Sequence, residues 1–295
     1  MRSVTWTIAV VGLLGAGSGC GGPVPEARFV QQADRLHREA LASAVTTDPD
    51  LGEYVQEIGK RVIDAAKVVV PRQAGAELFS QVRFHLVGSP IVNAFTTGGV
   101  HVYVYTSLFQ LCDNEDELAA AIAHEYAHVL NLDVEKTGMR ADARRPLPLI
   151  AYDFVTLRFT VEQEQAADVL AFNLYARAGW DPGRFAALFD RLRDRYGGGP
   201  SSPDRTSLSM RVESARGMIG STSRNWRQIP VADPRTFTKL RQRVGSLRVQ
   251  GGTPEAQLFL RAFPNCLLGG DTAEQRDAQE RLKPPPPPPV QVEPS

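Results

Sequence analysis

The sequence has few features that would direct it to nucleic acid or cross-link it. Its 295 residues carry 33 basic and 33 acidic side chains and three cysteines. No basic stripe and no acidic tail breaks this balance, which argues against a nucleic-acid-binding protein and against a cation buffer. Apart from a proline-rich end, the composition is ordinary for a globular protein, and the chain is long enough to bury a substantial core.

The N-terminal residues are typical of an export signal. Arg2 precedes an apolar segment at residues 4–14, which is too short to cross a bilayer comfortably. Small residues then lead to Cys20, so residues 1–20 resemble a bacterial lipoprotein signal in which Cys20 is lipidated and anchors the chain to the membrane. Gly17 stands where an aliphatic residue is usual, and cleavage without lipidation is therefore the alternative.

Two cysteines remain when Cys20 is set aside, Cys112 and Cys266. An even pair in an oxidising compartment can form a disulfide. No spacing rule supports this pairing, and two buried free thiols are an equal alternative.

The rest of the chain is organised around a predicted helix at residues 117–130. This stretch has no glycine or proline and contains His124-Glu125-x-x-His128, and an acidic run at residues 113–116 can cap it. Positions four apart lie on the same helical face, so both imidazoles can bind one metal ion while Glu125 is placed to hold a water. A solvated histidine pair is the alternative. The apolar flanking residues instead predict a buried helix, in which polar groups need partners.

Upstream of this helix the pattern predicts a small sheet. Residues 79–87 and 100–105 alternate between apolar and polar side chains. With residues 91–95 and a glycine turn between them, they predict a small antiparallel sheet that leads into the histidine helix. His101 lies on the polar side of its strand and is predicted to be a surface residue rather than a metal ligand.

Zinc bound by two histidines needs a third protein ligand and an open position for water. The extended class of metalloproteases places a third histidine six residues after the second, but Val134 stands there, so that class is excluded. A downstream helical segment carries Glu164 and Asp168 on one face. Glu164 could bind the metal there while Asp168 accepts a hydrogen bond from a ligand histidine. Glu162 is the competing ligand, and Glu164 is favoured because it pairs with an aspartate one turn on.

Several short motifs occur in a fixed order along the chain. They are Asn93-Ala-Phe95, Gly98-Gly99, Val102-Tyr103, the acidic run before Leu118-Ala119, His124-Glu-x-x-His128, Glu164-x-x-Ala167-Asp168 and Ala178-Gly-Trp-Asp-Pro182. This order resembles zinc metallopeptidase family forty-eight, the HtpX-like and CAAX-prenyl-endopeptidase-like group, over about residues 51–216. The nearest members are the periplasmic lipoproteins, because no membrane helices surround the motif.

The resemblance implies an α+β fold, mainly a helical zincin domain of the gluzincin type, with a small antiparallel sheet packed beside the His-Glu-x-x-His helix. This domain is expected at residues 26–220, followed by a helical extension at 221–282 and a proline-rich disordered tail at 283–295. The resemblance also implies an edge strand that pairs with extended substrate, formed by Asn93, Ala94 and Phe95.

The metal site that the resemblance implies holds one zinc ion per chain. Its ligands would be His124, His128 and Glu164, with Glu125 as the general base. Asp168 would accept a hydrogen bond from a ligand histidine and so orient its ring.

The sequence departs from the family pattern in two places. Phe159-Thr160 stand where Ser-Arg is frequent, and Arg205-Thr206 occupy the positions of a usual His-Pro before Arg211-Val212. Arg205 could supply positive charge to the oxyanion in place of that histidine, although it cannot bind metal in the same manner. A surface loop arginine is the alternative for this residue.

These features predict a zinc-dependent endopeptidase of the bacterial cell envelope. It would hydrolyse peptide bonds in misfolded or unassembled proteins, with a zinc-bound water as nucleophile and Glu125 as the base. The predicted location is a periplasm-facing lipoprotein of the outer membrane, with polypeptide substrates and no nucleic acid. A chaperone-like envelope lipoprotein that keeps the zinc site but cuts little is the main alternative, and a structural envelope protein without metal is the third.

Overall fold

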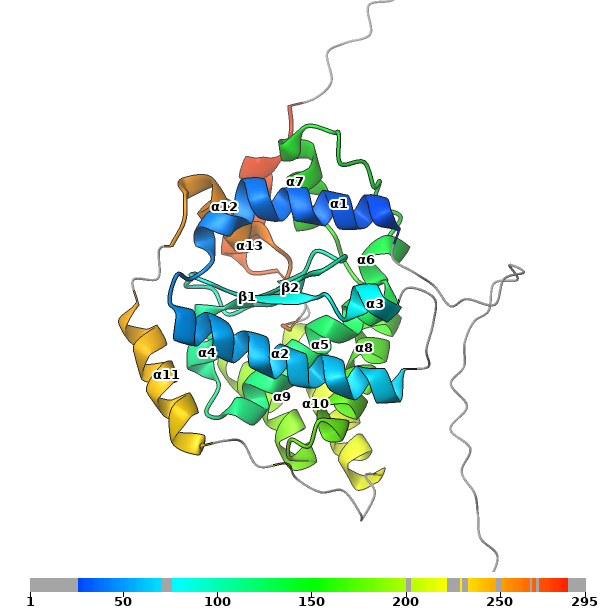
Figure 1. The fold of residues 1–295 in the computed structure, drawn as a ribbon, viewed down its shortest axis with the longest axis vertical. Helices are drawn as coiled ribbons and strands as arrows, with labels where there is room; N and C mark the ends of the chain where they lie inside the picture. The colour runs from blue at the N-terminus through cyan, green and yellow to red at the C-terminus, as the bar shows by residue number, and fades with distance from the viewer. Residues whose placement is uncertain are drawn as a thin grey trace, which may run out of the picture.

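A three-stranded sheet lies at the centre of the molecule, with helices on both of its faces (Figure 1). It is formed by β1 (Arg83–Val87), β2 (Ala94–Thr96) and β3 (His101–Tyr105) in the order β1-β3-β2. The computed structural model describes residues 26–70, 76–199, 203–221, 229, 233–247, 251–265, 267–268 and 271–285.

The sheet is mixed rather than wholly antiparallel. The strands β2 and β3 form the predicted hairpin, whose turn uses left-handed backbone at Gly98 and Gly99 with φ of 71° and 59°. The strand β1 pairs with β3 in parallel, because residues 88–93 carry the chain past β3 before β2 begins. Alternating polarity predicts strands but not their order, and the antiparallel prediction is wrong for this pair. The α+β, mainly helical fold is confirmed.

One face of the sheet packs on the layer of helices that contains the predicted metal motif. Val102 and Val104 of β3 and Phe84 of β1 join this hydrophobic core. The helices of this layer and its edge are α2 (Pro49–Val69), α3 (Ala76–Phe79), α4 (Thr106–Leu111), α5 (Glu115–Asn131), α6 (Asp133–Lys136), α8 (Val161–Arg177), α9 (Pro182–Tyr196), α10 (Pro203–Ser221) and α11 (Pro234–Ser246).

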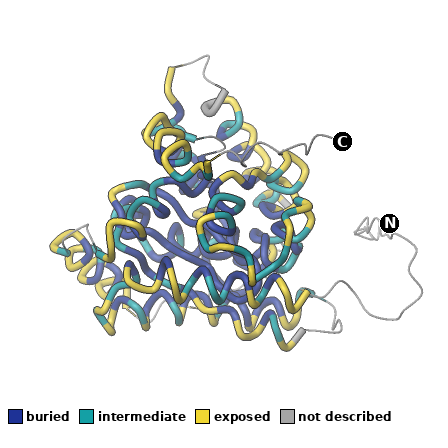
Figure 2. The backbone as a smooth tube through the Cα atoms, turned by 90° about the horizontal axis from the view of Figure 1, so that it is seen from above, coloured by how far each residue is buried: buried dark blue, intermediate teal, exposed yellow. Residues whose placement is uncertain are grey.

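The other face of the sheet is covered by the N-terminal helices, the C-terminal helices and α7 from the middle of the chain. Phe95, Tyr103 and Tyr105 belong to this second core. Its helices are α1 (Ala27–Leu36), the π-helical η1 (His37–Leu41), the 3-10 helix η2 (Ala42–Ala44), α7 (Leu147–Val155), α12 (Pro254–Ala262) and α13 (Ala273–Leu282). Figure 2 shows the resulting pattern, with buried backbone through the centre and exposed residues along the outer faces of the helices.

Capping residues set where the helices that carry the site begin. The Asn114 side chain accepts a hydrogen bond from the Glu117 amide at the start of α5. Thr160 and Gln163 form a reciprocal capping box at the start of α8. At its other end α5 stops at Leu132, whose left-handed φ of 55° turns the chain directly into α6.

Several predictions concern residues that are not described. Cys20, Cys266 and residues 286–295 lie outside the described residues, whereas Cys112 is buried. Among the described residues, no helix combines the length and apolarity needed to cross a membrane.

Candidate metal centre and active site

His124 and His128 of α5 face one point inside the protein. Both side chains are fully buried, and their Nε2 atoms lie 3.1 Å apart. The two rings are nearly perpendicular, with centroids 4.7 Å apart. Two nitrogen ligands on a tetrahedral zinc ion at about 2.0–2.1 Å each would be separated by about 3.3 Å, so the spacing of this pair fits a shared metal ion.

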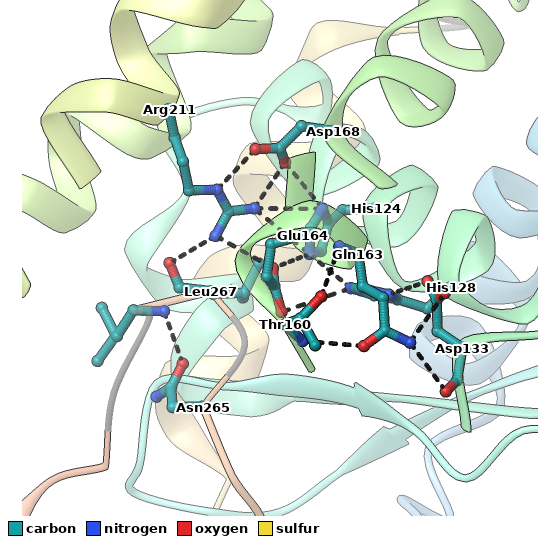
Figure 3. A network of polar contacts seen from close by, with 11 residues as sticks. His124, His128, Asp133, Thr160, Gln163, Glu164, Asp168, Arg211, Asn265 and Leu267 are labelled. Atoms are coloured by element: carbon teal, nitrogen blue, oxygen red, sulfur yellow. Dashed lines mark hydrogen bonds and ion pairs between the residues drawn. The ribbon is translucent and has the colours of Figure 1, made fainter. Parts of the chain in front are cut away.

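Glu164 brings a carboxylate from α8 to the same point (Figure 3). Its Oε2 lies 3.3 Å from Nε2 of His124, and its Oε1 lies 3.8 Å from Nε2 of His128. One ligand atom from each of the three residues falls within 4.8 Å of the others. Glu162, the competing ligand, is exposed to solvent. The structure therefore groups the histidine pair with Glu164.

Each histidine of the pair has a carboxylate behind it. Asp168 Oδ1 lies 2.9 Å from Nδ1 of His124, as expected from the sequence, and Asp133 Oδ2 lies 2.8 Å from Nδ1 of His128. Gln163 donates to Asp133 in turn, over 3.3 Å. A carboxylate on Nδ1 keeps the proton there and leaves Nε2 free to bind metal, which is the usual arrangement behind ligand histidines.

Asp133 was missed by the sequence reasoning. It lies just beyond the end of the histidine helix, where helical spacing no longer predicts which way a side chain points. The left-handed backbone at Leu132 returns the chain toward His128 and places the aspartate against its ring. An acidic residue immediately after the helix end was the one signal available.

Arg211 of α10 adds a buried positive charge to this cluster. Its guanidinium donates to both carboxylate oxygens of Asp168, over 2.6 and 2.8 Å, and packs over the ring of Phe189. It also lies 3.8 Å from Oε2 of Glu164. In the sequence, this arginine served only to align the chain with the family pattern, and no role was predicted for it. The side chain of Arg205, the predicted oxyanion group, is outside the described residues, and only its place in α10 is known.

Glu125 completes the group as a buried carboxylate beside the histidines. Burial raises the pKa of Glu125, although the two neighbouring histidines oppose the shift. Among the described residues, neither of its oxygens has a hydrogen-bond partner, and Oε2 of Glu164 has none of good geometry, although it lies 3.3 Å from Nε2 of His124. Buried carboxylate oxygens need a partner, and a metal ion with its water would supply one to each residue. The residues present thus fit a zinc ion.

Contacts within the cluster lower the pKa values of two acidic groups, Glu164 and Asp168, and raise the pKa of His124. Burial opposes ionisation of Glu164 and Asp168. Hydrogen bonds with His124, together with the charge of Arg211, outweigh that effect and hold both pKa values below their usual range. Burial and Arg211 lower the pKa of His124, but the two carboxylates raise it to about 9. Without metal the cluster therefore keeps a proton on His124, which a metal ion must displace.

A cavity of about 160 Å³ opens beside Glu164 and Arg211. Phe159 and Met210 contribute apolar lining, and Asn265 closes it from the C-terminal part of the chain. Because this cavity adjoins the proposed ligand and the buried arginine, it is where a substrate group could reach the site.

The predicted substrate strand is covered by the chain itself. Asn93, Ala94 and Phe95 are all buried. Asn93 donates to the carbonyl of Pro264 over 3.1 Å, and the ring of Phe95 stacks on Phe263 with centroids 3.7 Å apart.

A second hydrogen bond holds the same segment in place. Asn265 donates to the carbonyl of Val92 over 2.8 Å. Residues 263–265 therefore lie against Phe95 and against the two residues that lead into β2.

Comparison with known proteins connects this geometry to one family. Residues 49–145 match the family model described as peptidase family M48, a span that holds His124, Glu125 and His128 but ends before α8. The beta-barrel assembly-enhancing protease of Escherichia coli (strain K12) is 26% identical over 214 residues, which cover 62% of this chain and 42% of that protein.

Two further relatives give a similar picture. The beta-barrel assembly-enhancing protease of Yersinia pestis is 25% identical over 205 residues, covering 61% of this chain and 40% of that protein. The mitochondrial metalloendopeptidase OMA1 of Schizosaccharomyces pombe is 31% identical over 123 residues, covering 37% of this chain and 36% of that protein. The chain thus spans about two fifths of the length of the curated relatives that it matches.

Proposed function

Because the chain belongs to peptidase family M48, we propose that it is a zinc-dependent endopeptidase whose metal is held by His124, His128 and Glu164. The observation that carries this proposal is the convergence of these three side chains beside Glu125, which is buried and has no hydrogen-bond partner among the described residues. Zinc bound there would lower the pKa of a water molecule and polarise the carbonyl of a peptide bond.

Glu125 is the general base in this proposal. Burial raises the pKa of Glu125, which makes its carboxylate a better proton acceptor than an exposed glutamate. With both oxygens free of other described partners, it can take a proton from the attacking water with one and orient that water with the other. The same carboxyl group then donates the proton to the leaving amine, which returns Glu125 to its starting state.

Asp168, Asp133 and Arg211 prepare the ligands for this step. The two aspartates hold the histidine rings by their Nδ1 atoms, so that each Nε2 points toward Glu164. Arg211 is committed to Asp168 by two hydrogen bonds and balances the negative charge around it. For this reason we assign the oxyanion role to Arg205, earlier on the same helix, and not to Arg211.

The proposed substrate is an extended segment of a misfolded or unassembled protein of the cell envelope. The name of the bacterial relatives, beta-barrel assembly-enhancing protease, supports an envelope role. We also propose that the chain is a periplasm-facing lipoprotein of the outer membrane, held through lipid on Cys20. Residues 263–265 contact Asn93 and Phe95, and we propose that this segment moves away when a substrate pairs with the main chain of β2.

The proposal is tested by zinc content and by cleavage of unfolded casein. Glu125→Gln should keep its zinc and lose cleavage, because it removes the base without removing a ligand. Glu164→Ala should lose one equivalent of zinc, whereas Glu162→Ala, on the same helix and exposed, should keep it. Arg205→Ala should lower kcat with little change in KM. Full cleavage by Glu125→Gln would overturn the assignment of the base.

A second function is favoured by the contacts of residues 263–265 with the segment around β2. If residues 263–265 stay in place, the chain could bind unfolded envelope proteins and cut them slowly or not at all. Zinc on His124, His128 and Glu164 together with capture of casein, but without cleavage of casein, would support this chaperone-like function. Cleavage at a rate that depends on zinc would exclude it.

A further inference from the structure

All five histidines of the chain fall into two clusters. His124 and His128 form the first, and the remaining three, His37, His85 and His101, come together in the second. They arise from η1, β1 and β3 respectively, on the face of the sheet that lies away from α5. The prediction that His101 is a surface residue is wrong, since its side chain is 1% exposed.

The nitrogen spacing of the second cluster resembles that of the first, but the orientation of its rings differs. Nε2 of His85 lies 2.9 Å from Nδ1 of His101, close to the 3.1 Å between the two Nε2 atoms of the first pair. The ring of His37 lies 4.4 Å from that of His85 and 4.5 Å from that of His101, centroid to centroid. One nitrogen from each residue falls within 4.8 Å of the others, as in the first cluster. The ring of His37 stacks on those of His85 and His101 at interplanar angles of 25° and 16°, whereas the rings of the first pair are nearly perpendicular. Because an imidazole binds a metal ion in the plane of its own ring, His37 has to rotate out of this stack to share an ion with the other two.

A carboxylate also stands behind the second cluster. Nε2 of His101 lies 2.7 Å from Oδ1 of Asp34, which keeps the proton on that nitrogen and directs the Nδ1 lone pair toward His85. The same relation joins Asp133 to His128 in the first cluster. A carboxylate, a histidine and a metal ion in this order form a recurrent arrangement in zinc proteins.

The backbone at His37 is unusual in the same place. His37 begins the π-helical turn η1, which follows α1 without a break. Single π-helical turns are rare and frequently lie at functional sites, because the wider turn rotates a side chain out of the regular helical position. Here the turn carries His37 over the sheet, where Nδ1 lies 3.0 Å from the hydroxyl of Tyr103.

We propose that His37, His85 and His101 bind a second transition-metal ion, which joins η1 to β1 and β3. Three imidazoles suit zinc above other abundant divalent ions, with water as the fourth ligand. Such an ion would tie the N-terminal helix to the central sheet, across residues that lie far apart in the sequence. This site is independent of the proposed peptidase function, because its ligands come from other elements on the other face of the sheet.

The test measures zinc bound per full-length chain after dialysis against a zinc buffer. We expect two equivalents for the unchanged protein and one for His85→Phe, which keeps a ring in the stack but removes both nitrogens. Asp34→Ala should keep the ligands but weaken the second equivalent by about 10- to 100-fold. Tyr103→Phe is the matched control and should keep both equivalents, because the lost hydroxyl is not a ligand.

Cobalt provides a second readout that does not depend on activity. Loaded into Glu164→Ala, cobalt should give the visible absorption of a four-coordinate ion, and adding His85→Phe should abolish it. If His85→Phe fails to fold, His37→Gln at the partly exposed side of the cluster serves instead. The proposal is overturned if the unchanged protein and a folded His85→Phe or His37→Gln variant bind the same number of zinc ions.

Discussion

The two aspartates behind the first histidine pair should respond differently to removal. Asp168 orients His124 and also neutralises the buried Arg211, whereas Asp133 orients His128 and otherwise contacts the amide of Gln163. Replacing either by alanine removes one histidine contact. Only Asp168→Ala also leaves a buried guanidinium without its principal carboxylate. Comparing the two variants therefore separates the effect of a carboxylate on metal affinity from its effect on the stability of a buried charge.

The expected magnitudes follow from these contacts. Loss of a carboxylate behind a ligand histidine weakens metal binding by about 10- to 100-fold, and this should hold for both variants. Leaving a buried charge unpaired costs about 3 to 5 kcal/mol of unfolding free energy. Arg211 is 7% exposed, and in Asp168→Ala it keeps its contacts with the carbonyl of Leu267 and with the carboxylate of Glu164, so the lower end of that range applies. Asp133→Ala leaves the donors of His128 and Gln163 without this acceptor, which should lower the unfolding free energy by about 1 to 3 kcal/mol.

Two measurements on each purified variant check this prediction. Zinc affinity is obtained by competition with a chromophoric chelator, and unfolding free energy by urea titration of protein kept free of metal. Asp168→Asn is a useful third variant, because it retains the shape of the side chain but not its charge. It should resemble Asp168→Ala in stability more than it resembles the unchanged protein.

Either of two results would contradict these roles of Asp168 and Asp133. Equal unfolding free energies for metal-free Asp168→Ala and Asp133→Ala would show that Arg211 does not depend on Asp168 for its charge balance. Unchanged zinc affinity in Asp133→Ala would show that the contact with His128 does not orient a ligand.

Three further predictions concern packing, access and pH. Gly59→Ala would place a Cβ 2.1 Å from Cδ2 of Phe84 and should lower the unfolding free energy by about 1 to 3 kcal/mol. Gly52→Ala, in open space on the same helix, should raise the unfolding free energy by about 1 kcal/mol. The midpoints of urea unfolding distinguish the two variants. Asn265→Ala removes the two hydrogen bonds of its side chain, worth about 2 kcal/mol together, and should raise the initial rate of casein cleavage by up to about 30-fold at equal zinc content. An unchanged rate would mean that this segment does not control access. Because the pKa of His85 is lowered to about 3, the unfolded chain gains a proton at this residue below pH 6.5 that the folded chain does not. His85 alone should therefore lower metal-free stability by up to about 1.4 kcal/mol per pH unit as the pH falls from 6.5 toward 3, and His85→Phe should remove that contribution from the slope measured in urea titrations.

The part of the site that could be predicted from sequence is the part set by local geometry. Helical spacing places His124 and His128 on one face without knowledge of the rest of the fold. Glu164 was favoured because an aspartate follows one turn later, and the structure groups it with the histidines. The family resemblance is confirmed by the match over residues 49–145 and by the metallopeptidase relatives.

The part that could not be predicted depends on contacts between distant segments. Arg211 meets Asp168 across 43 positions, and the sequence contains no spacing rule that links α10 to α8. His101 was assigned to solvent because its strand face carries polar atoms. That face is covered by η1, α7 and α12, and the polar atoms of His101 and Tyr105 are bonded to Asp34 and Leu260 instead. The polar side chains of this face predicted exposure to solvent, but the face is buried, because the polar atoms of His101 and Tyr105 have partners inside the protein.

The position of β3 between the two helical layers makes the two metal proposals separable. Val102 and Val104 face the layer of α5, while His101 and Tyr103 face η1, because side chains alternate along a strand. A His85→Phe variant that loses one zinc equivalent but still cleaves casein would assign the second ion to the structure alone. Loss of cleavage with the zinc at His124 and His128 retained would instead require coupling through the sheet, by way of the ring of Tyr103, which stacks on both His85 and Phe95.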